Sequence, residues 1–403
     1  MLPLYLHVEV VMDSSRIATL QHSLPFFTWY ATSPHGERAG KPGVVDLLFG
    51  NPHDMPIPAY VEALQRHVVP QDPSWFAYKF DEPVATATAA AGLGRHTGFD
   101  WNDDDIAMTN GGWGAIAVAI RALVEPGDEV IYYDPPWFFY DLLIRGAEAT
   151  PVPLQLEPPR FSPDSDRLAA AITPRTRAVL VNTPHNPSGR ILDAAELDAL
   201  ADVLRDASNR HGRPIYLLSD EAYRVIALDG RRAPSPAEHY DRTLVLYSYG
   251  KQLLAPGQRI GYLALSPRIP AEERATLREA VRTAQFVNSY SWPNALLQRA
   301  LPDFADLVID LSAIERRRDL LVPALQRLGY EPTTPEGTFY LMARSPVEDD
   351  LAFVDRLAHG DTYVLPGTTV MMPGWFRVSL TASDSMVEAS VERFASAREP
   401  VRA

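Results

Sequence analysis

Between Asp46 and Leu265 the sequence alternates short apolar runs with segments of helical period, and this alternation limits the possible folds more than any other feature. The short runs have the length and composition of buried strands. Strands that alternate with helices build a largely parallel sheet that is covered by helices. We therefore predict an α/β domain around such a sheet. The expected strands are residues 105–109, 129–133, 177–182, 215–220 and 243–249.

One helix start is marked clearly in the sequence. Asp193 and Glu196 have the spacing of a capping box, in which the side chain of each residue accepts a hydrogen bond from the backbone N–H of the other. Behind this box, Leu197, Leu200 and Leu204 fall on one helical face. This spacing predicts an amphipathic helix that packs on the sheet. Further helices are expected at residues 115–124 and 139–145.

The pattern changes near Asp303, where a long helical stretch runs to Gly329. Short strands (338–342 and 376–380) and a last helix after Ser383 indicate a second, smaller α+β domain. Residues 20–58 are rich in Pro, Gly and aromatic residues, so we expect an irregular N-terminal arm. A chain of 403 residues has about the right length for two domains. The predicted large domain covers 46–301, and the arm (1–45) joins 302–403 in the small domain.

Charge and residue usage exclude several classes of function. A protein that binds duplex nucleic acid needs a basic face, and nothing in a chain of net charge -14 suggests one. The sequence has no cysteine, which excludes disulfides and thiol nucleophiles, and we expect no metal site. Met1 to Val11 carries His7 and Glu9 without a basic start, unlike a signal peptide. No apolar run reaches the roughly 18 residues of a membrane helix. We expect a cytoplasmic protein.

A glycine-rich segment, Asn110-Gly-Gly-Trp-Gly114, joins an expected strand to an expected helix. Free N–H groups and the helix dipole favour an anion there, so the segment is a candidate phosphate site or an ordinary tight turn. Gly112, Gly114 and Ala117 also fit G-x-G-x-x-A, and Asp134 ends the next strand. A dinucleotide site is therefore a rival interpretation.

Three more segments follow strands, and ligands of such sheets bind beyond these strand ends. Trp137 can stack on a planar ring or belong to the core. Asn186 lies in a rigid loop with two prolines and a glycine, and can present its amide to a ring oxygen. Asp220 and Tyr223 can face one ligand, because a buried carboxylate requires a cation such as a protonated pyridine nitrogen. Asp220 can otherwise be a helix cap.

Lys251 is the strongest single candidate for chemistry. The chain has only three lysines among its 37 Lys and Arg residues, and this one follows an unusually apolar strand. A partly desolvated lysine near other cations has a lowered pKa and becomes a nucleophile. Arg259, eight residues further on, is of the type that binds phosphate. A solvated surface charge is the usual role of a lysine, and these facts argue against it here.

Taken in order, these segments resemble the class I/II aminotransferases, which are fold type I pyridoxal-phosphate enzymes of the aspartate-aminotransferase type. The resemblance covers the chain from about Asp46 to its C-terminus and displaces the dinucleotide interpretation. It implies a mostly parallel seven-stranded sheet in the large domain. The matching motifs are Asn-Gly-Gly (110–112), Pro-Pro-Trp (135–137), His-Asn-Pro-Ser-Gly (185–189), Asp-Glu-Ala-Tyr (220–223), Lys251 with Arg259, and Phe-Arg-Val-Ser-Leu (376–380).

The resemblance also implies a role for each site residue. Lys251 would bind pyridoxal 5'-phosphate covalently and shuttle protons, and Asp220 would pair with the pyridine nitrogen. Arg377 would bind the substrate α-carboxylate in a bidentate fork, and Gly50 would line the substrate site. The other cofactor-binding residues would be Asn186 and Tyr223 at the ring hydroxyl, Trp137 on the ring face, and Gly112, Trp113, Ser248 and Arg259 at the phosphate. Tyr78 would reach the phosphate of the neighbouring subunit, which implies a homodimer with shared active sites.

The substrate preference depends on Trp113. In one branch of the family a lysine at this position binds the second carboxylate of aspartate. Tryptophan has no charge, and an apolar site desolvates a carboxylate without compensation. Phe26, Phe27, Trp29 and Tyr30 of the arm, with Tyr290 and Trp292, add aromatic character. We expect large neutral or aromatic amino donors. In the alternative, Trp113 belongs to the core, and Arg16, Arg38 or an arginine of the partner subunit serves the distal carboxylate.

The sequence thus predicts an aminotransferase that moves an α-amino group between an amino acid and a 2-oxo acid. One alternative is another pyridoxal-phosphate reaction on the same fold, such as β-elimination, oxidation or cyclisation, because the fold supports many chemistries. A second is a binding module without activity. The presence of Lys251, Asp220 and Arg377 together argues against the second.

Overall fold

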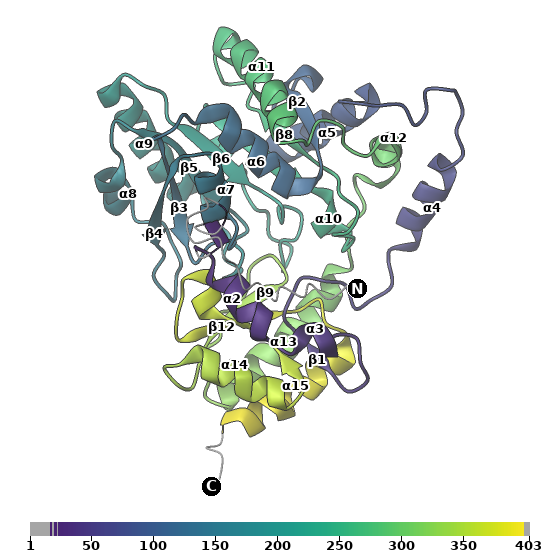
Figure 1. Cartoon of the computed structure of the whole chain (residues 1–403), viewed down its shortest axis with the longest axis vertical. Coiled ribbons are helices and arrows are strands. Elements are labelled where there is room, and N and C mark those ends of the chain that lie inside the picture. The colour runs from purple at the N-terminus through teal and green to yellow at the C-terminus, as the bar shows by residue number, and fades with distance from the viewer. Residues whose placement is uncertain (1–16, 18–19, 22, 399–403) are drawn as a thin grey trace.

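The computed structural model of the chain describes residues 17, 20–21 and 23–398 (Figure 1). A seven-stranded sheet of order β2-β8-β7-β6-β5-β3-β4 forms the centre of the large domain. Strand β8 is antiparallel to both of its neighbours, and the other adjacent pairs are parallel. The predicted mostly parallel sheet is therefore confirmed. Its strands are β2 (Ile106–Thr109), β3 (Glu129–Asp134), β4 (Thr150–Gln155), β5 (Thr176–Asn182), β6 (Tyr216–Asp220), β7 (Thr243–Ser248) and β8 (Gly261–Leu265).

The sequence predicted five of these strands and missed β4 and β8. Strand β4 contains Pro151 and Pro153, which are unfavourable inside a sheet because proline has no N–H to donate. The structure places β4 at the edge of the sheet, where only β3 needs to pair with it. An edge position is the one that tolerates proline, so the sequence signal for a strand was weak for a physical reason.

Helices cover the sheet of the large domain (Figure 1). The predicted capping box of α9 is present: Asp193 accepts from the backbone of Glu196, and Glu196 accepts from the backbone of Asp193. The helix ends at Gly212, whose left-handed φ of 61° suits a residue without a side chain. The helices are α4 (Pro58–His67), α5 (Pro83–Thr97), α6 (Gly111–Leu123), α7 (Tyr140–Gly146), α8 (Ser165–Ala171), α9 (Ala194–His211), α10 (Tyr249–Gln252), α11 (Ala271–Val287) and α12 (Ala295–Phe304), with short 3-10 turns η1 (Asp103–Asp105) and η2 (Pro236–Glu238).

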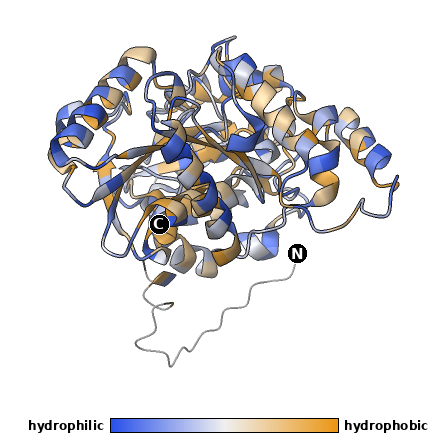
Figure 2. Ribbon diagram, turned by 90° about the horizontal axis from the view of Figure 1, so that it is seen from above, coloured by the Kyte–Doolittle hydropathy of each residue, from blue (hydrophilic) through white to orange (hydrophobic). Residues whose placement is uncertain are grey.

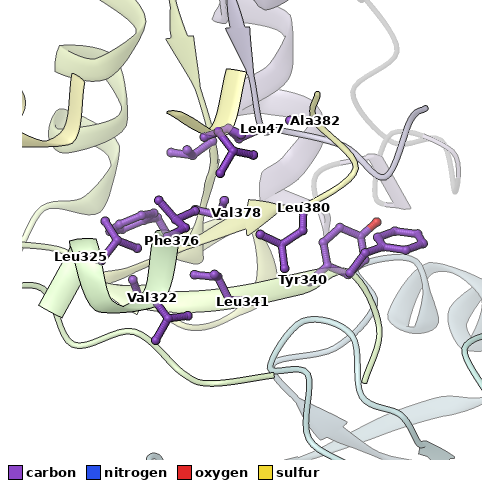
Figure 3. Close-up of a cluster of buried hydrophobic side chains, with 14 of the residues drawn as sticks. Leu47, Val322, Leu325, Tyr340, Leu341, Phe376, Val378, Leu380 and Ala382 are labelled. Carbon is purple, nitrogen blue, oxygen red and sulfur yellow. The ribbon is translucent and has the colours of Figure 1, made fainter. Parts of the chain in front are cut away.

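The small domain lies below the large one in Figure 1 and contains a three-stranded antiparallel sheet of order β11-β12-β9. Its core gathers side chains from this sheet and from α13, among them Leu341, Phe376, Val378 and Leu325 (Figure 3). The helical stretch predicted from about Asp303 to Gly329 is one helix, α13, and the helix before it, α12, ends at Phe304 and packs on α4 and α5 of the large domain. The elements are α13 (Leu311–Arg327), β9 (Tyr340–Arg344), α14 (Asp350–His359), β10 (Thr362–Tyr363), β11 (Leu365–Pro366), η3 (Gly367–Val370), β12 (Trp375–Ser379) and α15 (Asp384–Arg398).

The arm is more regular than expected. Its described part forms α2 (Pro25–Thr32), α3 (His35–Arg38) and β1 (Val45–Asp46), and β1 pairs in parallel with β10 of the small domain. The prediction of an irregular arm was wrong because Pro25 lies in the first turn of α2, where a missing N–H costs nothing. Leu47 lies in the small-domain core (Figure 3). The exact domain boundaries at 46 and 301 stay a prediction.

Hydrophobic residues are concentrated in the layers between the sheet and its helices, as the view from above shows (Figure 2). Leu197, Leu200 and Leu204 of α9 are all buried there, as their spacing predicted. Among the residues that the structure describes, no helix combines the length and the apolar character that crossing a membrane requires. The assessment of Met1 to Val11 falls outside the described residues.

Candidate active site

The candidate residues follow five strands and meet at the carboxyl ends of these strands. Strands β2, β3, β5, β6 and β7 are oriented in the same direction, so the segments that follow them lie on the same side of the sheet. The glycine-rich segment follows β2, Trp137 follows β3, Asn186 follows β5, Asp220 ends β6 and Lys251 follows β7. The large domain therefore brings together, in space, motifs that are spread over about 140 residues of sequence.

The first turn of α6 is a candidate anion site. Helix α6 begins at Gly111, which has a φ of +78°. A Cβ on Gly111 would lie 2.9 Å from Nη2 of Arg259, and a Cβ on Gly112 would lie 3.2 Å from Cβ of Ser248. The positive φ of Gly111 favours glycine, and a side chain at either position would press on Arg259 or Ser248. The free N–H groups of a 13-residue helix, one hydroxyl and one guanidinium suit a phosphate group.

Asp220 is a buried carboxylate, 6% exposed, at the end of β6. Burial raises its pKa to about 6, although the hydroxyl of Tyr140, the N–H of Ala222 and the charge of Lys251 each lower it. The Tyr140 hydroxyl donates to Oδ2 of Asp220 at 2.5 Å, and the Ala222 N–H donates to Oδ1 at 3.2 Å. A carboxylate in this position is stabilised by a cation that enters the site.

Lys251 lies in the short helix α10, directly beyond the buried strand β7. Its Nζ atom is 5.8 Å from the centre of the Tyr223 ring and 6.0 Å from that of Phe339. Its charge also acts on Asp220, so the two groups share one site. The lysine therefore projects toward the junction of the two domains, where a ligand held by α6 can be reached.

Arg377 of β12 enters the same site from the small domain and is 2% exposed. Its Nη1 donates to Oδ1 of Asn186 and its Nη2 donates to the carbonyl of Leu48, each at 3.0 Å. The guanidinium lies 4.0 Å from the centre of the Tyr340 ring. Within the described residues its Nε atom is buried without a hydrogen-bond partner. A buried guanidinium with an unused donor is suited to an incoming carboxylate.

The remaining predicted residues surround this arginine. Asn186 is buried, and its N–H donates to Oδ1 of Asn182 at 2.7 Å, which fixes the loop after β5. Tyr223 is buried beside Arg377 and Tyr340, and burial raises its pKa well above the usual value, so its hydroxyl keeps its proton. Gly50 is packed so tightly that a Cβ there would overlap the Tyr340 hydroxyl. The backbone at Gly50 therefore borders the site closely.

Aromatic side chains from α2, α6 and the segment before α7 form one cluster beside the glycine-rich segment 110–114, which we call the phosphate loop. The ring centres of Trp113 and Phe139 are 4.2 Å apart, and those of Trp113 and Trp137 are 5.1 Å apart. On the arm, Phe26 stacks on Phe138 at 4.4 Å and Phe27 lies 6.0 Å from Phe139. We call Phe26, Phe27, Trp113, Phe138 and Phe139 the aromatic cluster. It links the arm to the cofactor side of the site.

Tyr78 is the one predicted cofactor residue that a single chain does not bring to this site. It is 85% exposed, and its ring lies 5.1 Å from that of Trp292. Tyr290 lies closer to the phosphate loop, since a Cβ on Gly114 would be 4.0 Å from its ring. The predicted role of Tyr78 concerns the neighbouring subunit, and an exposed position is compatible with it.

Sequence reasoning missed several residues of the site. Tyr140 contacts Asp220, Tyr340 lies under Arg377, and Phe339 lies near Lys251. Tyr340 and Phe339 lie in the segment 338–342, which was predicted as a strand. The sequence did not indicate that they contact Arg377 and Lys251. Tyr140 had no signal that distinguishes it from a core aromatic residue.

Comparison with known proteins gives a consistent result. The sequence pattern of the family "Aminotransferase class I and II" matches residues 42–394. The aspartate/prephenate aminotransferase of Thermus thermophilus is 31% identical over 87% of this chain and 90% of its own length. The probable N-succinyldiaminopimelate aminotransferase of Mycobacterium tuberculosis is 31% identical over 78% and 79%. An aminotransferase structure from Eubacterium rectale superposes with a TM-score of 0.85 over 96% of both chains at 29% identity.

These likenesses define the protein as a fold type I enzyme that depends on pyridoxal phosphate. The chain belongs to the class I and II aminotransferase family, and it is an aminotransferase. The described residues fit the cofactor: the Gly111–Gly112 turn with Arg259 suits its phosphate, and the buried carboxylate of Asp220 suits a protonated ring nitrogen. When bound, the cofactor supplies the electron sink that makes the α-proton of an amino acid removable.

Proposed function

We propose that this aminotransferase takes its amino group from large neutral or aromatic amino acids and transfers it to a 2-oxo acid. The observation that carries the proposal is the contact of Trp113 with Phe139, at 4.2 Å, in the first turn of α6. Side chains at this point border both the cofactor phosphate site and the aromatic cluster. An apolar surface favours an apolar or aromatic substrate side chain and disfavours a second carboxylate.

The name of the Thermus thermophilus relative includes aspartate, whose side chain requires a cation. Two arginines of the arm were considered as that cation. Arg38 is engaged elsewhere, in an ion pair with Asp361 at 2.6 Å. Arg16 lies outside the described residues. The pairing of Arg38 favours the neutral substrate over the dicarboxylate.

We further propose roles for the site residues. Lys251 carries the cofactor and moves the proton at the substrate α-carbon. Asp220 holds the proton at the ring nitrogen, and Arg377 binds the substrate α-carboxylate with Gly50 and Asn186 beside it. The residues that hold the cofactor are Gly112, Trp113, Ser248 and Arg259 at the phosphate, Trp137 on the ring face, and Asn186 and Tyr223 at the ring hydroxyl. A cytoplasmic location stays a prediction.

A homodimer with shared active sites is part of the proposal. Tyr78 lies in a group of exposed aromatic residues with Trp292 and Phe286, each of which is 48% exposed. Exposed aromatic residues that gather in one place are typical of an interface. Hybrid dimers test the sharing directly. Lys251→Ala subunits mixed with Tyr78→Ala subunits should form one intact site per hybrid and regain activity.

The matched mixture combines Lys251→Ala with Asp220→Ala subunits, which cannot form an intact site because both residues belong to the same site. Activity that rises only in the first mixture supports shared sites. Equal activity in both mixtures contradicts them, and sedimentation of the wild-type protein as a monomer contradicts the dimer itself.

The substrate proposal is tested by single-turnover reactions with phenylalanine, leucine, glutamate and aspartate. The rate at which pyridoxamine phosphate forms, followed by absorbance at several donor concentrations, gives kcat/KM for each donor. Phenylalanine or leucine should exceed aspartate by at least about tenfold, which is the effect of one uncompensated polar group. A higher value for aspartate than for both neutral donors refutes the proposed role of the aromatic cluster.

A further inference from the structure

We propose that Tyr140 is a positioning residue, which holds the Asp220 side chain as an anion in one orientation and thereby keeps the proton on the ring nitrogen of the cofactor. The inference rests on the proposed role of Asp220 and adds a residue to it. Neither the strand-end motifs nor the comparisons assign any role to Tyr140. The inference is drawn from the contact between the two side chains and from the turn that carries Tyr140.

Both oxygens of Asp220 are held by different elements. The Tyr140 hydroxyl donates to Oδ2 at 2.5 Å, and the backbone of Ala222 donates to Oδ1 at 3.2 Å. The carbonyl of Asp220 accepts from Nδ2 of Asn182 at 2.8 Å. The backbone and the carboxylate are therefore fixed independently. Each carboxylate oxygen has two lone pairs, so one on each oxygen remains for a ligand.

The position of Tyr140 follows from the turn between β3 and α7. Tyr140 is the first residue of α7, and its N–H donates to the carbonyl of Trp137 at 3.0 Å. The rings of these two residues lie 5.5 Å apart in an edge-to-face arrangement. The same turn therefore presents Trp137, which is proposed to cover the face of the cofactor ring, and Tyr140, which holds the carboxylate proposed to bind the ring nitrogen.

The charged and titratable groups that act on Asp220 come from three elements. Lys251 of α10 and Tyr140 of α7 favour its anion, and the neighbouring Glu221 of its own segment opposes it. Tyr223 lies close enough to act on both Asp220 and Tyr140. Burial raises the pKa of Tyr140 well above its usual value, so its hydroxyl stays protonated and acts as a donor.

This donor changes how strongly Asp220 competes for a proton. A carboxylate that accepts a hydrogen bond is less basic than one that does not. Without the Tyr140 hydroxyl, Asp220 is more basic and competes more strongly with the ring nitrogen for the proton. Because a neutral ring is a poorer electron sink, the loss of one buried hydroxyl should weaken catalysis without removing any group that touches the substrate.

The first test uses the apoprotein, so it does not depend on activity. With 13C-labelled aspartate, the carboxyl resonance of Asp220 is assigned by its absence in Asp220→Asn, and its pKa is measured by NMR. Tyr140→Phe should raise this pKa by about one pH unit, the effect of one hydrogen bond to a charged group. Tyr132→Phe is the matched control, because Tyr132 lies beside Tyr140 but donates only to Asp141, at 3.5 Å.

The second test uses the cofactor labelled with 15N in its ring. In the wild type and in Tyr132→Phe the ring nitrogen should have the chemical shift of the protonated form, and in Tyr140→Phe the shift should move toward the unprotonated form. Tyr140→3-fluorotyrosine keeps the packing and strengthens the donor, so it should lower the pKa of Asp220. An unchanged Asp220 pKa in both Tyr140 variants, or an equal rise in Tyr132→Phe, overturns the proposal. If Tyr140→Phe does not fold, the fluorinated variant decides alone.

Discussion

Nη1 of Arg377 donates to Oδ1 of Asn186 at 3.0 Å, and this bond joins β12 of the small domain to the loop after β5 in the large domain. The same guanidinium donates to the carbonyl of Leu48, where the arm enters the large domain. The proposed carboxylate site is therefore built from three parts of the chain. A substrate bound to Arg377 contacts the junction of the domains, so its binding is coupled to their relative position.

Arg377→Ala should raise KM for α-amino acids and lower kcat/KM by about 10² or more, because a buried bidentate contact to a carboxylate is lost. Arg377→Lys should recover little, since an ammonium cannot form the fork. Steady-state kinetics with phenylalanine measures both effects. The control is Arg318→Ala, which removes another buried arginine, one that pairs with Asp319 of its own helix α13 and with Asp229 of the large domain. Equal KM values in the Arg377 and Arg318 variants would show that Arg377 is only structural.

Lys251→Ala should abolish transamination while leaving the phosphate site of α6 intact. Borohydride reduction of the wild-type holoenzyme, followed by peptide mass spectrometry, should place the pyridoxyl label on Lys251. The chain has two other lysines as internal controls, of which Lys79 is paired with Glu82 at 3.2 Å. A label on Lys41 or Lys79 in place of Lys251 would refute the assignment of the whole site.

Asp220 should make the apoprotein less stable as the pH rises. Its pKa is about 6 in the folded protein, above the usual aspartate value of 3.8, so the folded state holds the proton more strongly than the unfolded state. The stability contribution is complete below about pH 4 and is lost as the pH rises to about 6. The difference of about two pH units corresponds to about 3 kcal/mol. Urea unfolding of the apoprotein from pH 4 to 8 measures this loss.

Asp220→Asn removes the titrating group, so its free energy of unfolding should fall less between pH 4 and pH 6 than that of the wild type. Asp202→Asn, at an exposed carboxylate of α9, is the matched control and should follow the wild-type curve. Parallel curves for the wild type and Asp220→Asn would mean that Asp220 keeps an ordinary pKa. In that case the buried carboxylate would not favour a cationic ligand.

The sequence predicted those parts of the site whose physics is local. Asp220 and Lys251 could be found because a charged residue directly after a buried strand is unusual in itself. Gly112 could be found because a glycine-rich turn between a strand and a helix leaves N–H groups free. In the structure Arg259 lies against Gly111, and the anion site itself stays a prediction. In each case the signal lies within a few residues of the functional group.

The parts that could not be predicted depend on partners distant in sequence. Tyr140 and Asp220 are 80 residues apart, and a tyrosine at a helix start has no feature that identifies its partner. The same holds for Tyr340 under Arg377. Helix α2 was missed because Pro25 and the proline- and glycine-rich sequence around the helix are typical of loops, and its stability comes from packing, such as Phe26 on Phe138. Such contacts exist only after the chain has folded.

Trp113→Lys is the sharpest test of substrate choice, because it places a cation at the position where the aromatic cluster meets the phosphate loop. The new ammonium can pair with a second carboxylate, and the lost indole removes the ring contacts with Phe139 and Trp137. The ratio of kcat/KM for aspartate to that for phenylalanine should rise by about tenfold to a hundredfold, the effect of one hydrogen bond to a charged group. Trp113→Phe keeps an aromatic ring without a charge, so this control should leave the ratio nearly unchanged. If Trp113→Lys and Trp113→Phe change the ratio equally, residue 113 belongs to the packing around α6 and does not contact the substrate side chain.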